Sequence, residues 1–293
     1  MRLILLAAVT LGLAAANIST APAAERVDFP SATPSPTPFA LKQAKARGIE
    51  PRRERGTPLQ GLLVRPDGPG PFPAVVLLHG CDGVQSFQER WADDLVSWGY
   101  VALLVDSHGP RGLGDDCARW PPTAGSRSED ALGALGYLRG LPFVEPGRVG
   151  VMGWDTGGRT VMRAVEQKGP QEDLGAGFAA CVALYPGTFR LSVAAAPLLI
   201  LIGGEDDCTP ASRVRRAMQE APPGPFPPRL EVLPGARHGF DDPRFAEPVR
   251  LAAAQAPFCF SPAESGGTTL AYSEAARAAA AGQVHAFLDE QLR

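Results

Sequence analysis

The chain has 293 residues, of which 45% are hydrophobic and 20% are charged, and its formal net charge is −3 at pH 7. This composition is that of a globular protein with enough residues for one sizeable core. The near-neutral charge leaves no large basic field, which argues against a nucleic acid partner.

Residues 1–24 predict a secretory signal peptide. Arg2 supplies a basic start, Leu3 to Ala16 are apolar, and an A-x-A pattern follows at Ala21 to Ala23. The apolar run is shorter than the roughly 20 residues that cross a bilayer. We therefore expect export to the periplasm or the medium. The remaining chain contains no candidate span, so we expect the mature protein to be soluble, with no membrane partner.

Residues 25–58 form a separate N-terminal part in this interpretation. The segment 25–31, "ERVDFPS", alternates weakly and predicts an edge strand. The segment 33–56 is rich in proline and basic residues and poor in apolar ones. That composition is typical of a mobile insertion.

Residues 59–293 predict one domain in which strands alternate with helices. Apolar runs that stop at glycine or acidic residues predict strands, and apolar residues at helical spacing predict helices. The expected strands are 59–66, 72–80, 100–107, 148–155, 179–187, 197–207 and 229–240. The expected helices are 86–99, 128–140, 157–167, 210–220 and 272–292. This alternation indicates an α/β domain with a mostly parallel sheet and helices on both faces.

Polar residues follow these strands directly, and ligands bind outside the carboxyl ends of such strands. They are His79 to Gly83, Asp106 to Arg111, Asp155, Asp206 and His238. The stretch 149–160, "VGVMGWDTGGRT", has the form of a strand, a tight glycine turn and a helix. In G-x-S-x-G enzymes this turn exposes a nucleophile, and here its central residue is Asp155.

The chain order Asp155, Asp206, His238 is the α/β-hydrolase order of elbow residue, acid and histidine. Six segments carry a wider resemblance: "PFPAVVLLHGCDG", "DSHGPRG", "GVMGWDTGG", "ALYPG", "LLILIGGEDDCTP" and "LPGARHGFDDP". Through these segments the chain resembles the dienelactone hydrolase family of α/β-hydrolases. The resemblance implies the α/β-hydrolase fold, and we expect no cap domain. The resemblance implies Asp206 as the triad acid, His238 as the base, and the amides of Cys81 and Thr156 as an oxyanion hole. It also implies that His79 is structural.

The sequence leaves two interpretations open for the triad acid, for Arg111 and for Trp154. Asp207 is a competing acid one position along, and Asp206 is also placed to cap the helix near Pro210. Arg111 either binds a substrate carboxylate or pairs with the acidic residues at 115–116. Trp154 either packs in the core or contacts substrate.

Five cysteines in an exported chain make disulfides plausible. Cys81 and Cys117 follow neighbouring strands at one sheet edge, which permits a bridge, and Cys208 with Cys259 is a second candidate pair. Cys181 lies inside an apolar strand and predicts a buried thiol. No metal-ligand cluster or phosphate-binding glycine loop is visible, so no cofactor is expected.

Aspartate changes what the elbow residue does. A carboxylate is already ionised at neutral pH and suits displacement at saturated carbon, as in haloalkane dehalogenases and epoxide hydrolases. Those relatives usually carry a cap after the sixth strand, where this chain has only "TFRLSVAAA", and no pair of donor tyrosines is evident. At an ester carbonyl the adduct expels the carboxylate, so we expect water attack with Asp155 or His238 as general base.

The sequence therefore predicts an exported hydrolase of small carboxylic esters or lactones. The alternatives are a binding protein that lost its nucleophile and a displacement enzyme that uses Asp155 covalently. Two flanking carboxylates favour the imidazolium form of His238, so we expect activity to rise with pH through a raised histidine pKa. The segment 242–270 is expected to cover the mouth of the site.

Overall fold

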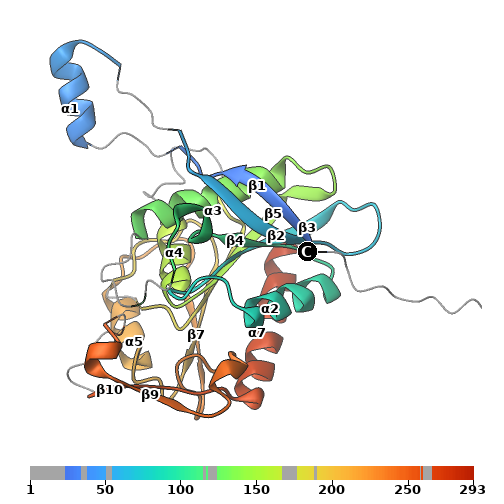
Figure 1. The fold of residues 1–293 in the computed structure, drawn as a ribbon, viewed down its shortest axis with the longest axis vertical. Helices are drawn as coiled ribbons and strands as arrows, with labels where there is room; N and C mark the ends of the chain where they lie inside the picture. Colours follow the sequence, from blue (N-terminus) through green and yellow to red (C-terminus); the bar gives the residue numbers. More distant parts are fainter. Residues whose placement is uncertain are drawn as a thin grey trace, which may run out of the picture.

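The computed structural model describes residues 24–33, 38–50, 55–114, 117, 124–166, 177–187, 190–257, 259 and 266–293. Its main sheet has eight strands in the order β1-β2-β4-β3-β5-β6-β7-β8 (Figure 1). The strands are β1 (Glu25–Pro30), β2 (Pro58–Val64), β3 (Phe72–Leu78), β4 (Val101–Asp106), β5 (Val144–Trp154), β6 (Ala180–Leu184), β7 (Leu198–Gly203) and β8 (Arg229–Leu233). The β1–β2 and β2–β4 pairs are antiparallel and all other pairs are parallel, which confirms the predicted fold class.

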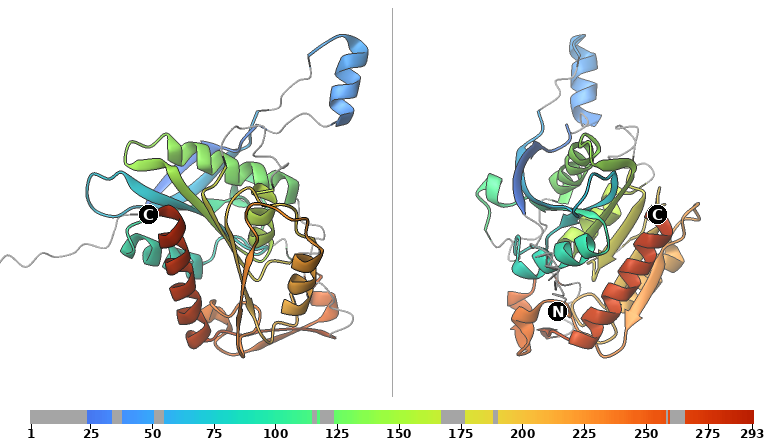
Figure 2. Two further views of the ribbon diagram at one scale, coloured as in Figure 1. Left: turned by 180° about the vertical axis from the view of Figure 1, so that it is seen from behind. Right: turned by 90° about the vertical axis from the view of Figure 1, so that its right-hand side faces the viewer.

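Helices cover both faces of this sheet (Figure 2). One face carries α2 (Ser86–Ser97) and α7 (Glu274–Leu292), and the other carries α3 (Ala124–Arg139), α4 (Thr156–Ala164) and α5 (Ala211–Glu220). Side chains alternate between the two cores because successive strand residues point to opposite faces. Val76 and Leu78 of β3 pack with α3 and α4, whereas Val75 and Leu77 pack with α2 and α7. The central strand is therefore buried on both sides, as its continuous apolar run predicts.

The first helix corrects the prediction of a mobile insertion at 33–56. Within it the structure has α1 (Pro38–Arg47), which stands away from the sheet (Figures 1 and 2). Proline fits the first helical position, and the following residues are mostly good helix formers. Gly48 has a φ of +64°, the left-handed conformation that commonly ends a helix.

A second, two-stranded sheet was not predicted. It pairs β9 (Val249–Ala252) antiparallel with β10 (Gly267–Leu270). Three short 3₁₀ helices complete the described elements: η1 (Gly109–Arg111), η3 (Pro243–Phe245) and η4 (Ala253–Gln255). All but the last residue of the predicted signal peptide lies outside the described residues, so that peptide stays a prediction.

Candidate active site

Asp155 occupies a sharp turn between β5 and α4. Its backbone has φ 49° and ψ −113°, a conformation that side-chain-bearing residues rarely adopt. The Asp155 N–H donates to Leu184 O at 3.0 Å, and its carbonyl accepts the Arg159 N–H at 3.0 Å. Such backbone strain costs about 1–3 kcal/mol and persists at functional sites. The geometry is that of a nucleophile elbow with a carboxylate at its tip.

The glycines around Asp155 are required by close backbone approach. A β carbon on Gly153 would lie 2.5 Å from Gly157 O, and one on Gly157 would lie 2.1 Å from Leu78 O. Both distances are far below van der Waals contact. The elbow therefore packs directly against the end of β3, which brings the turn after β3 beside Asp155.

Asp206 and His238 meet at the neighbouring strand ends, after β7 and β8. His238 Nδ1 donates to Asp206 Oδ2 at 2.9 Å, and both side chains are buried. The other oxygen of Asp206 accepts the N–H groups of Cys208 and Thr209 at 2.9 and 2.7 Å. Asp206 therefore contacts the histidine and holds the turn before α5. It does not cap the helix as the alternative predicted, because the N-cap of α5 is Pro210 and no side chain caps it.

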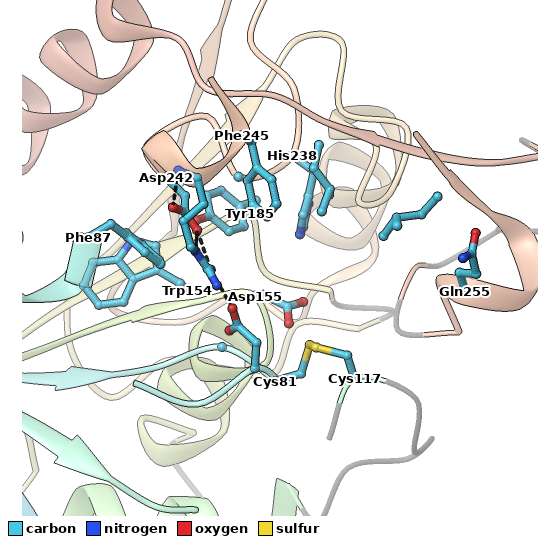
Figure 3. A pocket seen from close by; sticks show the side chains of 16 residues that line it. Cys81, Phe87, Cys117, Trp154, Asp155, Tyr185, His238, Asp242, Phe245 and Gln255 are labelled. Carbon is cyan, nitrogen blue, oxygen red and sulfur yellow. Dashed lines mark hydrogen bonds and ion pairs between the residues drawn. A yellow bond between two sulfur atoms is a disulfide. The ribbon is translucent and has the colours of Figure 1, made fainter. Parts of the chain in front are cut away.

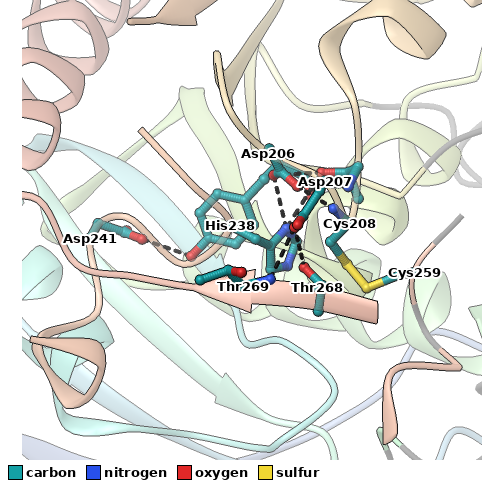
Figure 4. A network of polar contacts seen from close by, with 10 residues as sticks. Asp206, Asp207, Cys208, His238, Asp241, Cys259, Thr268 and Thr269 are labelled. Atoms are coloured by element: carbon teal, nitrogen blue, oxygen red, sulfur yellow. Dashed lines mark hydrogen bonds and ion pairs between the residues drawn. A yellow bond between two sulfur atoms is a disulfide. The ribbon is translucent and has the colours of Figure 1, made fainter. Parts of the chain in front are cut away.

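Asp207, the competing acid, has a different partner. Its carboxylate accepts from Thr268 Oγ1 at 2.6 Å, from Thr269 N–H at 3.0 Å and from Arg250 at 3.0 Å (Figure 4). Asp207 thus holds the β9–β10 sheet against the loop that carries Asp206. His238 is bridged to Leu270 of the same sheet.

Burial and charge act in opposite directions on His238. Burial lowers the pKa of its imidazole, while the charge of Asp206, the hydrogen bond to it and the charge of Asp155 raise it. The net effect is a pKa raised above the ordinary histidine value. This direction agrees with the expectation from two flanking carboxylates.

Asp155 and His238 line one cavity of about 320 Å³ (Figure 3). In that view the imidazole lies above the Asp155 carboxylate, and the Cys81–Cys117 disulfide lies below it. The other lining residues are Gly80, Asp82, Phe87, Trp154, Tyr185, Gly239, Asp242, Arg244, Phe245, Leu251, Gln255 and Leu270. Several of them belong to the described part of the segment 242–270, which therefore forms part of the wall; that the segment covers the mouth stays a prediction.

The predicted oxyanion donors lie at the two turns that meet at Asp155. Thr156 is the first residue of α4, so its N–H has no acceptor within the helix. Cys81 follows the turn of Gly80, whose β carbon would lie 3.8 Å from Asp155 Oδ2. The hydrogen bonds among the described residues do not use the Cys81 N–H. Both amides are placed for an oxyanion role, which remains a prediction.

A buried arginine under the elbow was missed by the sequence interpretation. Arg127 of α3 donates to Thr156 Oγ1 at 3.0 Å and to His79 O at 2.6 Å. Burial lowers the pKa of Arg127 to about 10, while the charges of Asp130 and Asp155 oppose that shift. His79 accepts the Ser107 N–H at 3.2 Å and is buried, which is the structural role the resemblance implied.

Arg111 does not lie in the cavity wall. Its two terminal nitrogens donate to the two oxygens of Asp130 at 2.8 and 2.7 Å, and Nη1 also reaches Ser107 O at 2.7 Å. The Asp130 side chain is buried, and this two-point contact fixes the orientation of the guanidinium. Neither predicted alternative named Asp130 as a partner of Arg111. Residues 115–116 lie outside the described residues, and binding of a substrate carboxylate by Arg111 stays a prediction.

A second carboxylate network, also missed, lies behind the cavity. Buried Asp241 accepts Trp91 Nε1, Trp154 Nε1 and Tyr185 OH at 2.8, 2.7 and 2.7 Å. The ring of Tyr185 lies 4.6 Å from that of His238. Trp154 therefore both packs in the core and forms part of the cavity wall. Only the "HGFDDP" segment after His238 pointed to this aspartate in the sequence.

Both predicted disulfides are confirmed, Cys81–Cys117 and Cys208–Cys259, and Cys181 is a buried free thiol. Each bridge starts at a residue of the site, since Cys81 is a predicted oxyanion donor and Cys208 donates to Asp206. No group of residues suited to a metal ion occurs in the part of the chain that the structure describes. Within those residues, no helix is both long and apolar enough to cross a membrane.

The strand order, the strained elbow and the acid–histidine pair together define an α/β-hydrolase. The chain belongs to the dienelactone hydrolase family, whose model matches residues 59–291.

Relatives and solved structures agree with that assignment. An uncharacterized protein of Mycobacterium tuberculosis is 28% identical over 237 residues, which cover 75% of this chain and 80% of that one. A Bradyrhizobium protein named a probable 2-oxo-3-(5-oxofuran-2-ylidene)propanoate lactonase is 26% identical over 211 residues, covering 66% and 83%. A dienelactone hydrolase-like promiscuous phosphotriesterase from metagenomic libraries has the same fold, with a TM-score of 0.63, 19% identity and coverage of 94% and 100%.

Proposed function

We propose that the chain is an exported hydrolase of carboxylic esters or lactones with an active centre formed by Asp155, Asp206 and His238. Its family membership makes it a hydrolase of the ester and lactone class. The observation that carries the proposed centre is the 2.9 Å contact of His238 Nδ1 with Asp206, at the wall of the cavity that Asp155 also lines. Export is supported by the two disulfides, because disulfides persist mainly in oxidising compartments.

The identity of residue 155 decides which group attacks the carbonyl carbon. A tetrahedral adduct of Asp155 would expel the better leaving group. The acid of a carboxylate has a pKa near 3.9, while that of an alkoxide lies near the 15.7 of water. Such an adduct returns to substrate, so we assign the attack to water.

In this mechanism neutral His238 is the general base. Its Nε2 takes a proton from water as the water oxygen bonds to the carbonyl carbon. The second hydrogen stays on that oxygen and donates a hydrogen bond to the Asp155 carboxylate. The carbonyl electron pair moves onto oxygen, towards the N–H groups of Cys81 and Thr156. On collapse the bond to the leaving alcohol breaks, and His238 returns the proton to it. Asp155 and Asp206 stabilise the transient imidazolium through their charges.

The displacement alternative would need leaving-group donors, and the two aromatic donors of the described cavity wall are already engaged. Trp154 Nε1 and Tyr185 OH are the polar hydrogens of its aromatic wall, and both donate to Asp241. A halide or an opened epoxide in the cavity would have to compete with a buried carboxylate for either donor.

Turnover of 4-nitrophenyl esters and lactones tests the proposal in wild type and four variants. We expect turnover by wild type and loss of about 10²–10⁴-fold in His238→Gln, the range that general bases contribute. Asp155→Asn should lose activity as well. Asp206→Asn and Asp207→Asn form a matched pair, of which the first should lose far more, because only Asp206 contacts the imidazole.

A single turnover in H₂¹⁸O separates water attack from covalent catalysis. Direct attack places the label in the product acid alone, and the peptide carrying Asp155 keeps its mass. A labelled Asp155 peptide would contradict the mechanism. An inactive wild type with activity gained in Asp155→Ser would instead favour the binding-protein alternative.

A further inference from the structure

Three charged residues of the cavity wall contact one another. Asp82 and Asp242 lie in the wall with Arg244 between them. Arg244 Nη2 donates to Asp82 Oδ2 at 2.6 Å, and Arg244 Nε donates to Asp242 Oδ2 at 2.8 Å. We call these three residues the acidic clamp. Two acidic side chains share one guanidinium, so the formal charge of the acidic clamp is −1.

No other arginine or lysine of the described lining offsets this charge. Arg127 and Arg159 lie outside the lining; both interact with the charge of Asp155, and Arg127 also interacts with that of Asp130. His238 is the remaining basic group of the described lining. In the neutral form required by the proposed mechanism it carries no charge.

Apart from Asp155, His238 and Gln255, the side chains of the remaining wall are apolar or aromatic, together with the Cys81–Cys117 disulfide. The residues are Phe87, Trp154, Tyr185, Phe245, Leu251 and Leu270. Aromatic faces attract cations and accommodate neutral rings. Arg111, the residue predicted to receive a substrate carboxylate, is instead held by Asp130. Among the described residues of this wall, no arginine or lysine is left to balance an anionic substrate.

We propose that the acidic clamp makes this cavity selective by charge, so that it accepts neutral or cationic aromatic and aliphatic esters or lactones and rejects those that carry a carboxylate. This inference rests on the proposed function for its substrates. Its physical basis is the repulsion between like charges in a partly desolvated site.

Three 4-nitrophenyl esters of similar size test the proposal: the hemisuccinate (anionic), the succinamate (neutral) and the trimethylammoniobutyrate (cationic). At low ionic strength we expect kcat/KM for the neutral ester to exceed that for the anionic one by about tenfold or more, and the cationic ester to match or exceed the neutral one. The gap between neutral and anionic esters should narrow in high salt. Equal rates for the anionic and neutral esters would overturn the proposal.

Two substitutions in the acidic clamp should move the preference in opposite directions. Asp82→Asn removes a negative charge and should reduce the discrimination against the anionic ester, whereas Arg244→Gln removes the positive charge and should increase it. A general disturbance of the wall would shift both variants the same way, which would count against the proposal. Asp67→Asn, in an exposed turn, is the matched control and should leave the ratio unchanged.

Binding separates this inference from the proposed function. Benzoate, benzamide and benzamidinium share one ring and differ in charge, and their affinities can be measured by calorimetry without any turnover. If the chain hydrolyses no ester but binds benzamide and benzamidinium more tightly than benzoate, the proposed function is refuted and the charge selectivity of the cavity is supported. Binding of benzoate at least as tight as that of benzamide, or no binding of any of the three, would overturn the charge selectivity.

Discussion

Asp241 is predicted to be a major determinant of stability, although it lies outside the proposed catalytic centre. Substitution Asp241→Leu leaves three buried donors without an acceptor, on Trp91, Trp154 and Tyr185. Each unsatisfied donor costs about 1–3 kcal/mol, and part of the total is recovered because a buried carboxylate is no longer desolvated. We expect a net loss of about 3–5 kcal/mol in the free energy of unfolding, the range found when one partner of a buried ionic network is removed.

The amide variant Asp241→Asn should be much milder. Its carbonyl oxygen can accept both indole N–H groups, and its NH₂ can donate to the Tyr185 oxygen, so we expect a loss of about 1–2 kcal/mol. Urea unfolding followed by tryptophan emission measures both variants, with Asp67→Leu as a surface control expected to lie within about 0.5 kcal/mol of wild type. The reasoning is refuted if Asp241→Leu unfolds within 1 kcal/mol of wild type, on the order of a single lost hydrogen bond, or if the amide costs more than leucine.

The Asp241 carboxyl should also make the free energy of unfolding depend on pH. Burial raises the pKa of Asp241, and the donors of Tyr185, Trp154 and Trp91 oppose that shift only in part. The folded state therefore binds this proton more tightly than the unfolded state does. The contribution of Asp241 to stability falls as pH rises from its unfolded pKa through the raised folded one. The stability difference between wild type and Asp241→Asn should accordingly be smaller at neutral pH than near pH 4, about the unfolded value.

Three further predictions concern the site and its supports. Because the pKa of His238 is raised and the base must be neutral, kcat/KM should increase with pH through a midpoint above the ordinary histidine value, and a flat profile from about pH 6 to 9 would contradict this. Replacing Cys208 and Cys259 by serine opens a loop closed over 51 residues, so thermal and urea unfolding should report a loss of about 4 kcal/mol by loop entropy. Arg111→Ala leaves buried Asp130 unpaired and should lower the unfolding free energy by about 3–5 kcal/mol, while the ratio of rates for anionic and neutral esters stays as in wild type.

Local patterns were enough to predict the sheet and the position of the elbow. Runs such as residues 74–78 are apolar at every position because their strands are buried on both faces, and this shows in the sequence without any knowledge of partners. The glycines at 153 and 157 mark the tight turn in the same way. The order of Asp155, Asp206 and His238 then placed three groups at one sheet edge, since parallel strands end there together.

Helix α1, in contrast, was not predicted from the local sequence. Proline and basic residues in 33–56 suggested a chain without regular structure. The run after Pro38 nevertheless has enough intrinsic helix propensity to form ten residues of helix, closed by Gly48. Composition averaged over the segment hid that short run.

The sequence by itself determined the strands of the main sheet and the helices that cover it, and which residues follow those strands, because hydrophobic periodicity and glycine geometry depend on near neighbours. Only the tertiary structure decided the partners of the charged groups. Arg111 binds Asp130 of α3, Asp207 contacts the β9–β10 sheet instead of His238, and Asp82 pairs with Arg244, which lies 162 positions further along the chain. A salt bridge or hydrogen bond forms with whichever group the fold brings within about 3 Å, and one-dimensional spacing carries no record of that distance.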